Sequence, residues 1–364
     1  MNNSPFSSGF SEARSKFLNA ADAAGATLSS YSHPENGPDG GALFTDCAWI
    51  GPKNALKVLV LVSGTHGVEG FCGSGAQIDW LSRREYALLG DDMAVLLIHA
   101  INPYGFAWKR RVTNENVDLN RNFVDFSAPL PANARYADIA DALKPTDWSV
   151  ESQSASRNIL LTFIQENGLA ALAQVVSGGQ YTHANGLFYG GSAPTWSRIT
   201  LEQIFSDHLS MAQEIGIVDY HTGLGPDGYA EPIVTSPKGS SEHLRALQWH
   251  GLATKCVDAG ESVSAAIAGD WLAMAPGLLP HAQVTAIALE YGTVDSMIVL
   301  EALRADNWLH AHGDPAGPEA VAIKAQILAA FYTDTDVWRG MVLGQSLMTV
   351  RKAINGLAGM TTGL

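Results

Sequence analysis

Four stretches of the chain are apolar at nearly every position, and each is short enough to be a strand. They cover residues 55–63, 94–101, 217–220 and 284–289, and the first of them reads ALKVLVLVS. Continuous runs of Val, Leu and Ile with this length are typical of strands that are covered on both faces. We therefore predict that these four segments form the buried part of a sheet.

Between these strands, apolar residues recur with the spacing of a single helix face. Helices are predicted over residues 11–24, 74–84, 195–216, 294–309, 320–332 and 337–354, and residues 130–175 are predicted to be mainly helical. The stretches rich in Gly and Pro at residues 33–41, 177–194 and 223–239 are predicted to be loops. Buried strands that alternate with helices predict an α/β fold, a three-layer α/β/α sandwich with a mixed, twisted sheet that is parallel in its centre.

The domain organisation is predicted to be simple. The sequence contains no repeat at a solenoid period and no low-complexity tract, so residues 1–364 are expected to form one domain. The segment 55–295 carries the motifs described below, and the helices of residues 295–364 are expected to pack on it.

Composition narrows the choice of partners and compartment. Lys and Arg number 22 and Asp and Glu 36, and the resulting net charge of −14 argues against nucleic acid and against an anionic membrane surface. The first residues show no charged region followed by an apolar one, as a secretory signal would. The three cysteines form no CxxC pair and fit a reducing compartment. We expect a cytoplasmic protein, and the oligomeric state is left open.

Residues that commonly bind metals follow the predicted strands. His66 and Glu69 lie in SGTHGVEG after the first strand, His221 follows the third strand, and Glu290 lies at the end of the fourth. In open α/β sheets, ligands bind beyond the carboxyl ends of the strands, so these side chains are expected to meet at one edge. Two histidines and one carboxylate are a ligand set for catalytic zinc. We predict one Zn²⁺ per chain, held by His66, Glu69 and His221.

The segment 102–123, NPYGFAWKRRVTNENVDLNRNF, is the most specific stretch of the sequence. Here the chain resembles the zinc carboxypeptidase superfamily, in which HxxE is followed by Asn-Pro-x-Gly, an arginine and Asp-Leu-Asn-Arg-Asn. The motifs occur in the same order over about residues 55–295, and a lone His after a strand and a late Glu complete the series. Residues 180–197, QYTHANGLFYGGSAPTWS, are similar to a mostly uncharacterised bacterial branch, related also to aspartoacylase and succinylglutamate desuccinylase.

This resemblance implies roles for further residues. Asn120 and Arg121 would hold a substrate carboxylate, a task that suits the two parallel hydrogen bonds of a guanidinium. An upstream arginine would stabilise the oxyanion; Arg111 matches the relatives that cleave N-acyl amino acids, and Arg110 is an alternative. Glu290 would act as the general base and then as the general acid.

The shared motifs leave the substrate open. A small peptide trimmed at its free C-terminus is favoured by the extended DLNRNF motif, and a small N-acyl amino acid is the alternative. A noncatalytic zinc-binding protein would be expected to have lost Glu290 or a metal ligand. The carboxypeptidases usually supply a tyrosine before the late Glu, but residues 262–289 contain none, so Tyr229 and Trp271 are candidate substitutes. The loop of residues 177–192 is expected to form a wall over the site.

Overall fold

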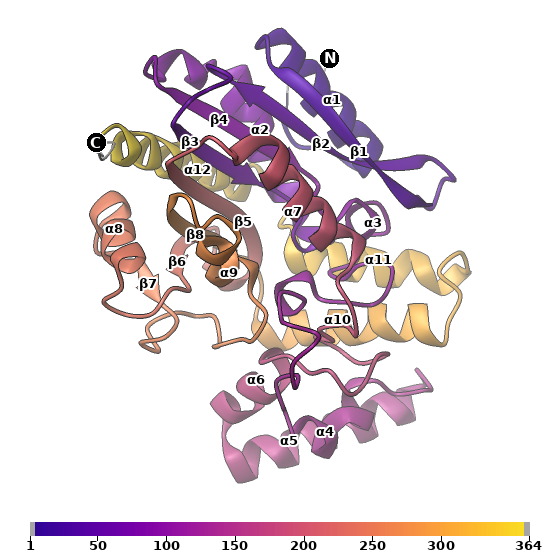
Figure 1. Ribbon diagram of the computed structural model, residues 1–364. Coiled ribbons are helices and arrows are strands. Elements are labelled where there is room, and N and C mark those ends of the chain that lie inside the picture. Colours follow the sequence, from indigo (N-terminus) through magenta and orange to yellow (C-terminus); the bar gives the residue numbers. More distant parts are fainter. Residues whose placement is uncertain (1–3, 360–364) are drawn as a thin grey trace.

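The computed structural model describes residues 4–359, which form an eight-stranded sheet with helices on both faces (Figure 1). The strand order is β1-β2-β4-β3-β5-β8-β6-β7. The strands are Thr27–Asn36 (β1), Ala42–Ile50 (β2), Lys57–Val62 (β3), Met93–His99 (β4), Glu214–Asp227 (β5), Ala230–Val234 (β6), Lys255–Cys256 (β7) and Gln283–Gly292 (β8).

The centre of the sheet is parallel. Strand β3 pairs in parallel with β4 on one side and with β5 on the other, and β5 pairs in parallel with β8. Strand β2 is antiparallel to β4, and β6 is antiparallel to β8. The sheet is therefore mixed and centrally parallel, which confirms the predicted fold class. Parallel strands bring their carboxyl ends to one edge, and the pairing of β5 with β8 places His221 directly opposite Glu290 there.

Helices precede, follow and connect these strands. They are Phe10–Ala23 (α1), Gly70–Ser82 (α2), Pro103–Ala107 (α3), Tyr136–Leu143 (α4), Val150–Asn167 (α5), Leu169–Ser177 (α6), Trp196–Leu209 (α7), Ser241–His250 (α8), Trp271–Leu278 (α9), Ser296–Ala311 (α10), Pro318–Phe331 (α11) and Asp336–Ala358 (α12). Short 3-10 helices lie at Gly67–Glu69 (η1), Glu85–Leu88 (η2) and Leu119–Arg121 (η3).

The two faces of the sheet are buried by different helices. Leu59 and Leu61 of β3 belong to an apolar cluster with α1, α2 and α12, whereas Val58, Val60 and Val62 belong to a second cluster with α7 and α9. All five side chains are fully buried. This alternation follows from the two-residue period of a strand, and burial on both faces explains why β3 is apolar throughout.

Four strands in the outer parts of the sheet were not predicted from the sequence. Strands β1 and β2 and the short β6 and β7 were missed, so parts of the predicted loops 33–41 and 223–239 are strand. Strand β1 is mostly exposed and carries Ser, His and Pro, so it lacks the apolar run of a central strand. Helix α7 is shorter at its C-terminal end than predicted, and β5 continues beyond residue 220. The predicted loop 177–194 remains free of helix beyond Ser177 and of long strands.

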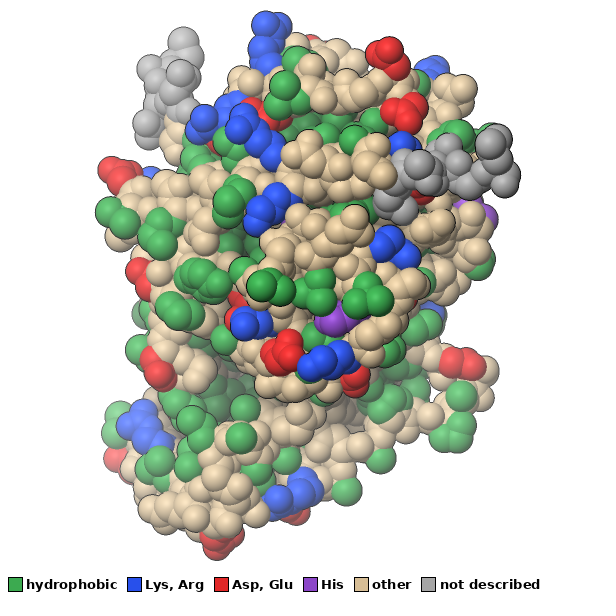
Figure 2. Space-filling view, turned by 90° about the vertical axis from the view of Figure 1, so that its left-hand side faces the viewer, with side chains coloured by type: hydrophobic (Ala, Val, Ile, Leu, Met, Phe, Trp, Pro, Cys, Tyr) green, Lys and Arg blue, Asp and Glu red, His purple; other side chains and the backbone are tan. Residues whose placement is uncertain are grey.

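Helices α4, α5 and α6 form a group of their own at the bottom of Figure 1. They share an apolar cluster with α10 and α11, which joins the group to the rest of the chain. Figure 2 shows charged and apolar side chains interspersed on one face of the molecule. In the described part of the chain, no single helix is long and apolar enough to cross a membrane; the bent pair α5 and α6 reaches that threshold only when the two are combined.

Candidate metal centre and active site

Three side chains with metal-binding atoms lie close together; two come from the segment after β3 and one from β5. His66 and Glu69 flank the start and end of η1, directly after β3, and His221 lies in β5. The Glu69 carboxylate lies 2.9 Å from His66 Nδ1 and 3.0 Å from His221 Nδ1, and the two Nδ1 atoms are 3.2 Å apart. The trio is buried, and its ligand atoms all lie within 4.8 Å of one another. The structure thus brings together the three residues predicted to hold the metal.

The turn that carries Glu69 is held in place by the following motif. The backbone N–H groups of Gly67 and Val68 donate to the carbonyl oxygens of Arg111 and Arg110 at 3.1 and 2.7 Å. A Cβ at Gly67 would lie 2.0 Å from the carbonyl carbon of Gly105, so this position requires glycine. The His-Gly and Asn-Pro-x-Gly motifs therefore depend on each other: both glycines permit the close approach that orients η1.

Each histidine presents its second ring nitrogen to a buried carboxylate. His66 Nε2 lies 3.0 Å from Asp118 Oδ1, and His221 Nε2 lies 2.7 Å from Asp219 Oδ2. Asp219 also accepts hydrogen bonds from Thr65 Oγ1 at 2.9 Å and from Trp271 Nε1 at 2.9 Å. Partners of this kind fix the ring orientation of a metal-binding histidine. Both Nδ1 atoms are left to face Glu69.

Sequence reasoning missed both of these aspartates. Asp118 is the first residue of the DLNRN motif, of which only the Asn and Arg were given roles. Asp219 precedes His221 by two positions, a spacing that places two side chains on the same face of a strand. Each aspartate therefore left a signal in the sequence, but the contact with a histidine is visible only in the structure.

Arg111, and not Arg110, lies at the cluster. Arg111 Nη1 donates to Glu69 Oε1 at 2.9 Å, and Arg111 Nε donates to Asp118 Oδ2 at 3.0 Å. Arg110 Nε instead donates to Asp306 Oδ2 at 3.0 Å, away from the residues that line the cavity. Position therefore favours Arg111 over the alternative that the sequence left open.

The charged side chains of the cluster shift one another's pKa values strongly. Burial opposes ionisation of each group, but His66, His221 and Arg111 outweigh it and hold the pKa of Glu69 far below its ordinary value. Against the same burial, Asp219 and Glu69 raise the pKa of His221 well above its ordinary value. The pKa of Asp118 is well below its ordinary value because Arg111 and Arg121 overcome the effect of burial. The pKa shift therefore keeps Glu69 ionised, and an ionised carboxylate is the form that can bind a metal.

Glu290 faces the same space from β8. It is 7% exposed and lines the cavity, and its Oε1 accepts a hydrogen bond from the Leu224 N–H at 3.0 Å. Burial, followed by the negative charge of Glu69, raises the pKa of Glu290 from 4.5 to about 8. Two carboxylates in one site with opposite pKa shifts suit different tasks, one as an anion and one as a proton carrier.

Asn120 and Arg121 also line the cavity, at η3. Arg121 Nε and Nη2 donate to the carbonyl oxygen of Ser177, and Arg121 Nη1 donates to the Asn120 carbonyl at 3.1 Å. The Arg121 guanidinium lies 3.8 Å from Asp118, its nearest carboxylate. Asn120 Oδ1 has no hydrogen-bond partner among the described residues. Both predicted carboxylate-binding residues therefore line the cavity, and backbone carbonyl groups hold the Arg121 guanidinium.

The cavity beside the cluster has a volume of about 630 Å³. Its polar end is formed by His66, His221, Arg111, Arg121 and Glu290. Its other walls are mainly apolar and come from α6, from the segment 257–273 and from α10. A cavity of this size and character suits a small organic molecule with one charged end.

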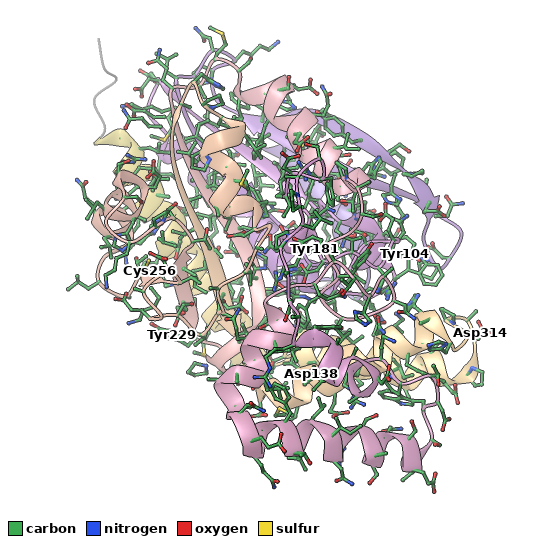
Figure 3. The ribbon with its side chains drawn as sticks, turned by 60° about the horizontal axis from the view of Figure 1, so that its bottom comes forward. Tyr104, Asp138, Tyr181, Tyr229, Cys256 and Asp314 are labelled. Atoms are coloured by element: carbon green, nitrogen blue, oxygen red, sulfur yellow. The ribbon has the colours of Figure 1, made fainter. Side chains whose placement is uncertain are left out.

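The predicted wall and the two candidate aromatic residues have different outcomes. Ser177 and Phe188 of the loop 177–192 line the cavity, as expected. No tyrosine of the described chain lines it. Tyr229 is 42% exposed and lies apart from Tyr181, on the side of Cys256 (Figure 3). Trp271 is fully buried with its indole on Asp219. Neither residue takes the place of the tyrosine that the resemblance would supply.

Solved structures similar to this chain share its α/β architecture. Carboxypeptidase A from Helicoverpa armigera covers 90% of this chain and 74% of its own, at 11% identity and a TM-score of 0.48. An aspartoacylase family protein from Mesorhizobium loti covers 79% and 67%, at 14% identity and a TM-score of 0.37. The murein-tripeptide amidase of Escherichia coli O157 covers 79% and 90%, at 17% identity and a TM-score of 0.35.

No curated protein matches the sequence. A family model does: it is described as "Protein of unknown function (DUF2817)", and it matches residues 6–345. That range contains the three predicted metal ligands His66, Glu69 and His221 together with Arg111, Arg121 and Glu290, so the whole site lies within the matched residues. The chain belongs to the DUF2817 family.

Proposed function

We propose that this protein is a zinc-dependent hydrolase that cleaves an amide bond next to a free carboxylate, as a metallocarboxypeptidase does. One observation carries the proposal: the two Nδ1 atoms and the Glu69 carboxylate converge at the end of a cavity that also holds Glu290 and two arginines. A ligand trio, a proton acceptor and two cations in one cavity are the parts that such a hydrolysis needs.

The donor set fits zinc. His66, Glu69 and His221 would hold the ion, because two imidazoles and one carboxylate are a known set for catalytic zinc and both rings are oriented by aspartates. Zinc in such a site supplies Lewis-acid chemistry, which polarises a carbonyl group and makes water more acidic. Arg111, which contacts Glu69 from the cavity side, supplies an additional positive charge at this end.

Glu290 is the proposed proton carrier. Its carboxylate is buried at the cavity wall and receives one backbone hydrogen bond, which holds it in place and leaves its second oxygen free to reach a water molecule. Burial and Glu69 make it a stronger base than an exposed glutamate. It would take a proton from the attacking water and deliver it to the leaving nitrogen.

The two arginines are proposed to bind different parts of the substrate. Arg121, with Asn120, would bind the free carboxylate, since a guanidinium matches a carboxylate with charge-assisted hydrogen bonds. Arg111, which lies nearer to the ligand trio, would stabilise negative charge on the carbonyl oxygen as the bond is attacked. The amide bond to be cleaved would therefore lie between Arg121 and Glu69.

The charges in the cavity favour a peptide over a dicarboxylic acyl amino acid. Arg111 and Arg121 are the cations that line the cavity in the described chain, and both already have a task. The remaining charged residues of its walls, Asp258 and Asp270, are acidic. A second or third substrate carboxylate would meet no cation there. An N-acyl amino acid with a neutral acyl group remains the alternative substrate.

A paired substrate panel tests the proposal. The zinc-loaded protein is incubated with N-blocked dipeptides and N-acyl amino acids, each with a free and with an amidated C-terminus, and the released amine is measured. We expect release from the free-carboxylate compounds and little from the amides. No release from any member, with zinc bound, would refute the proposed function, and release only from dicarboxylic acyl compounds would refute the argument from charge.

A further inference from the structure

The loop that follows α6 is built around Arg121. The Ser177 carbonyl accepts two hydrogen bonds from its guanidinium, and Tyr181 Oη donates to the Arg121 carbonyl at 2.6 Å. A Cβ at Gly179 would lie 2.7 Å from Arg121 Cδ, and one at Gly190 would lie 2.7 Å from the Arg121 carbonyl oxygen. The loop therefore packs against the whole length of this arginine, backbone and side chain.

One aromatic ring of the loop contacts both arginines of the cavity. The guanidinium carbon of Arg111 lies 5.2 Å from the centre of the Phe188 ring, and that of Arg121 lies 5.5 Å from the same centre. Phe188 is 9% exposed and lines the cavity. A cation near the face of an aromatic ring is attracted by it, and the attraction is larger where water is excluded. A single ring thus links two side chains that no hydrogen bond joins directly.

Phe188 occupies a backbone conformation that bulky residues rarely adopt. Its φ is 53°, whereas the left-handed positions on either side of it in the loop, at residues 179 and 191, are glycines with φ of 94° and 93°. Glycine adopts such angles without strain, and a bulky side chain does not. The loop therefore keeps a phenyl group at a position where glycine would relieve strain.

The surrounding hydrogen bonds impose this conformation. Tyr136 Oη donates to the carbonyl of Leu187, the Gln180 N–H donates to the carbonyl of Phe188, and the Asp118 N–H donates to the carbonyl of Tyr189. Their lengths are 3.0, 3.1 and 2.8 Å. Strained residues persist where the neighbouring structure determines them, and they concentrate at functional sites. One of these three anchors, Asp118, also orients His66 and binds Arg111.

We propose that Phe188 is a positioning residue that holds the guanidinium groups of Arg111 and Arg121 at a set separation for the substrate. The proposal rests on the proposed function for what the arginines bind, but the contact of one ring with two guanidiniums is independent of it. An aliphatic side chain of similar size would fill the space without attracting either cation.

The first experiment observes the arginines directly. The Nε–H resonances of Arg111 and Arg121 are assigned in the full-length protein with the help of arginine variants, and Phe188→Leu, Phe188→Tyr and Phe331→Leu are compared with the wild type. We expect Phe188→Leu to abolish the ring-current shift of both resonances and to increase their mobility, whereas Phe188→Tyr retains both features. Phe331→Leu is the matched control, because Phe331 also lines the cavity but contacts neither guanidinium face. Unchanged resonances in Phe188→Leu would overturn the proposal.

The second experiment measures whether Phe188 affects the binding of a substrate carboxylate. Binding of N-benzoylglycine and of its amide is measured by calorimetry on the zinc-loaded protein with Phe188 and on Phe188→Leu, Phe188→Tyr and Phe188→Gly, all carrying Glu290→Gln so that neither compound is cleaved. We expect Phe188→Leu and Phe188→Gly to weaken binding of the free carboxylate by about 5- to 30-fold, with little change for the amide, and Phe188→Tyr to restore it. Phe188→Gly should also unfold at a lower temperature than the wild type, because it removes a buried side chain from an apolar cluster, although glycine adopts the local φ freely.

The outcomes separate this proposal from the proposed function. Equal losses for carboxylate and amide would make Phe188 a packing residue and refute its positioning role. If the wild type cleaves no substrate, the proposed function fails, while the arginine resonances still decide whether Phe188 positions the two guanidiniums.

Discussion

Arg110 and Arg111 are neighbours in the chain, but they belong to two different buried charge clusters. Arg111 joins Glu69 and Asp118 beside the cavity. Arg110 joins Asp306 of α10, whose other oxygen accepts a hydrogen bond from the Lys324 ammonium of α11. The two clusters are similar in composition, since each combines arginine, aspartate and histidine, yet only the first lines the cavity.

The two clusters differ in whether atoms remain free to bind a ligand. In the second cluster, Asp306 uses one oxygen for Arg110 and the other for Lys324, and His310 Nε2 accepts from Lys324 at 2.7 Å. Every charge there has an opposite charge within contact. In the first cluster, aspartates take the outer nitrogens of both histidines, so the inner nitrogens turn toward Glu69 and the cavity. A buried ion cluster with satisfied partners is structural, and one with convergent donors at a cavity is a site for a ligand.

The largest expected effect is that of replacing Glu290, which lines the cavity beside the first cluster. Glu290→Gln keeps the size and the hydrogen bond from Leu224 but cannot accept a proton. Turnover should therefore fall by about 10²–10⁴, while zinc content and unfolding temperature stay unchanged. Steady-state kinetics and elemental analysis measure the two quantities. Loss of zinc would make Glu290 a ligand, and wild-type turnover would remove it from the reaction.

The next effect concerns the closed cluster and appears in stability. Asp306→Asn removes the charge that compensates Arg110 and Lys324 in a buried position, and should lower the free energy of unfolding by about 3–5 kcal/mol. Chemical denaturation measures it, with Asp314→Asn as an exposed control that should change stability by less than about 0.5 kcal/mol. Zinc content should stay at the wild-type value. An Asp306 variant as stable as the control would show that the cluster is not a structural element.

Arg121 should distinguish substrates rather than affect folding. Arg121→Ala removes a charge-assisted contact to the substrate carboxylate, which should cost about 1.5–3 kcal/mol, or somewhat more than tenfold in binding. Amidated substrates should lose much less. The measurement is kcat/KM for each substrate pair, and equal losses for both forms would show that Arg121 does not bind the carboxylate.

The smallest effect is a pH dependence in the closed cluster. Burial, and then the charge of Arg110, lowers the pKa of His310 from 6.5 to about 3. The unfolded chain therefore binds a proton at His310 before the folded chain does, so the stability that neutral His310 provides is present above pH 6.5 and is lost as the pH falls toward 3. This part of the slope is at most about 1.4 kcal/mol per pH unit.

A variant of His310 isolates this slope. The difference in unfolding free energy between wild type and His310→Gln should shrink as the pH falls from 6.5 toward 4, because the variant lacks the titrating group. A constant difference for His310→Gln would show that His310 is not buried as a neutral ring.

Much of the site could be predicted because strand position and ligand chemistry are both local properties of a sequence. The apolar runs of β3, β5 and β8 are unmistakable, and His66, His221 and Glu290 are placed by them at one edge. Parallel pairing then brings the three residues together without further information. The same signal failed for the edge strand β1, which is mostly exposed, and for its neighbour β2, whose apolar run is interrupted by Thr45 and Asp46 although most of the strand is buried.

The rest of the site depends on contacts between distant segments. The sequence favours Arg111 only through the resemblance and leaves Arg110 open, since their different partners are set by how the turn at Asn116 and helix α10 lie in space. Asp118 and Asp219 were missed for the same reason: an aspartate that orients a histidine is recognised by its distance from a ring nitrogen. The double contact of Phe188 could not be inferred at all, because it joins three segments of the chain.

The central claim is that the cluster of His66, Glu69 and His221 binds a metal and that the Asp306 cluster does not. The most direct measurement is the zinc content per chain of the wild type, His66→Ala, His221→Ala and His310→Ala, each purified in zinc, dialysed and subjected to elemental analysis. We predict one zinc per chain in the wild type and in His310→Ala, and none in His66→Ala or His221→Ala. Full zinc occupancy in both His66→Ala and His221→Ala would contradict the account.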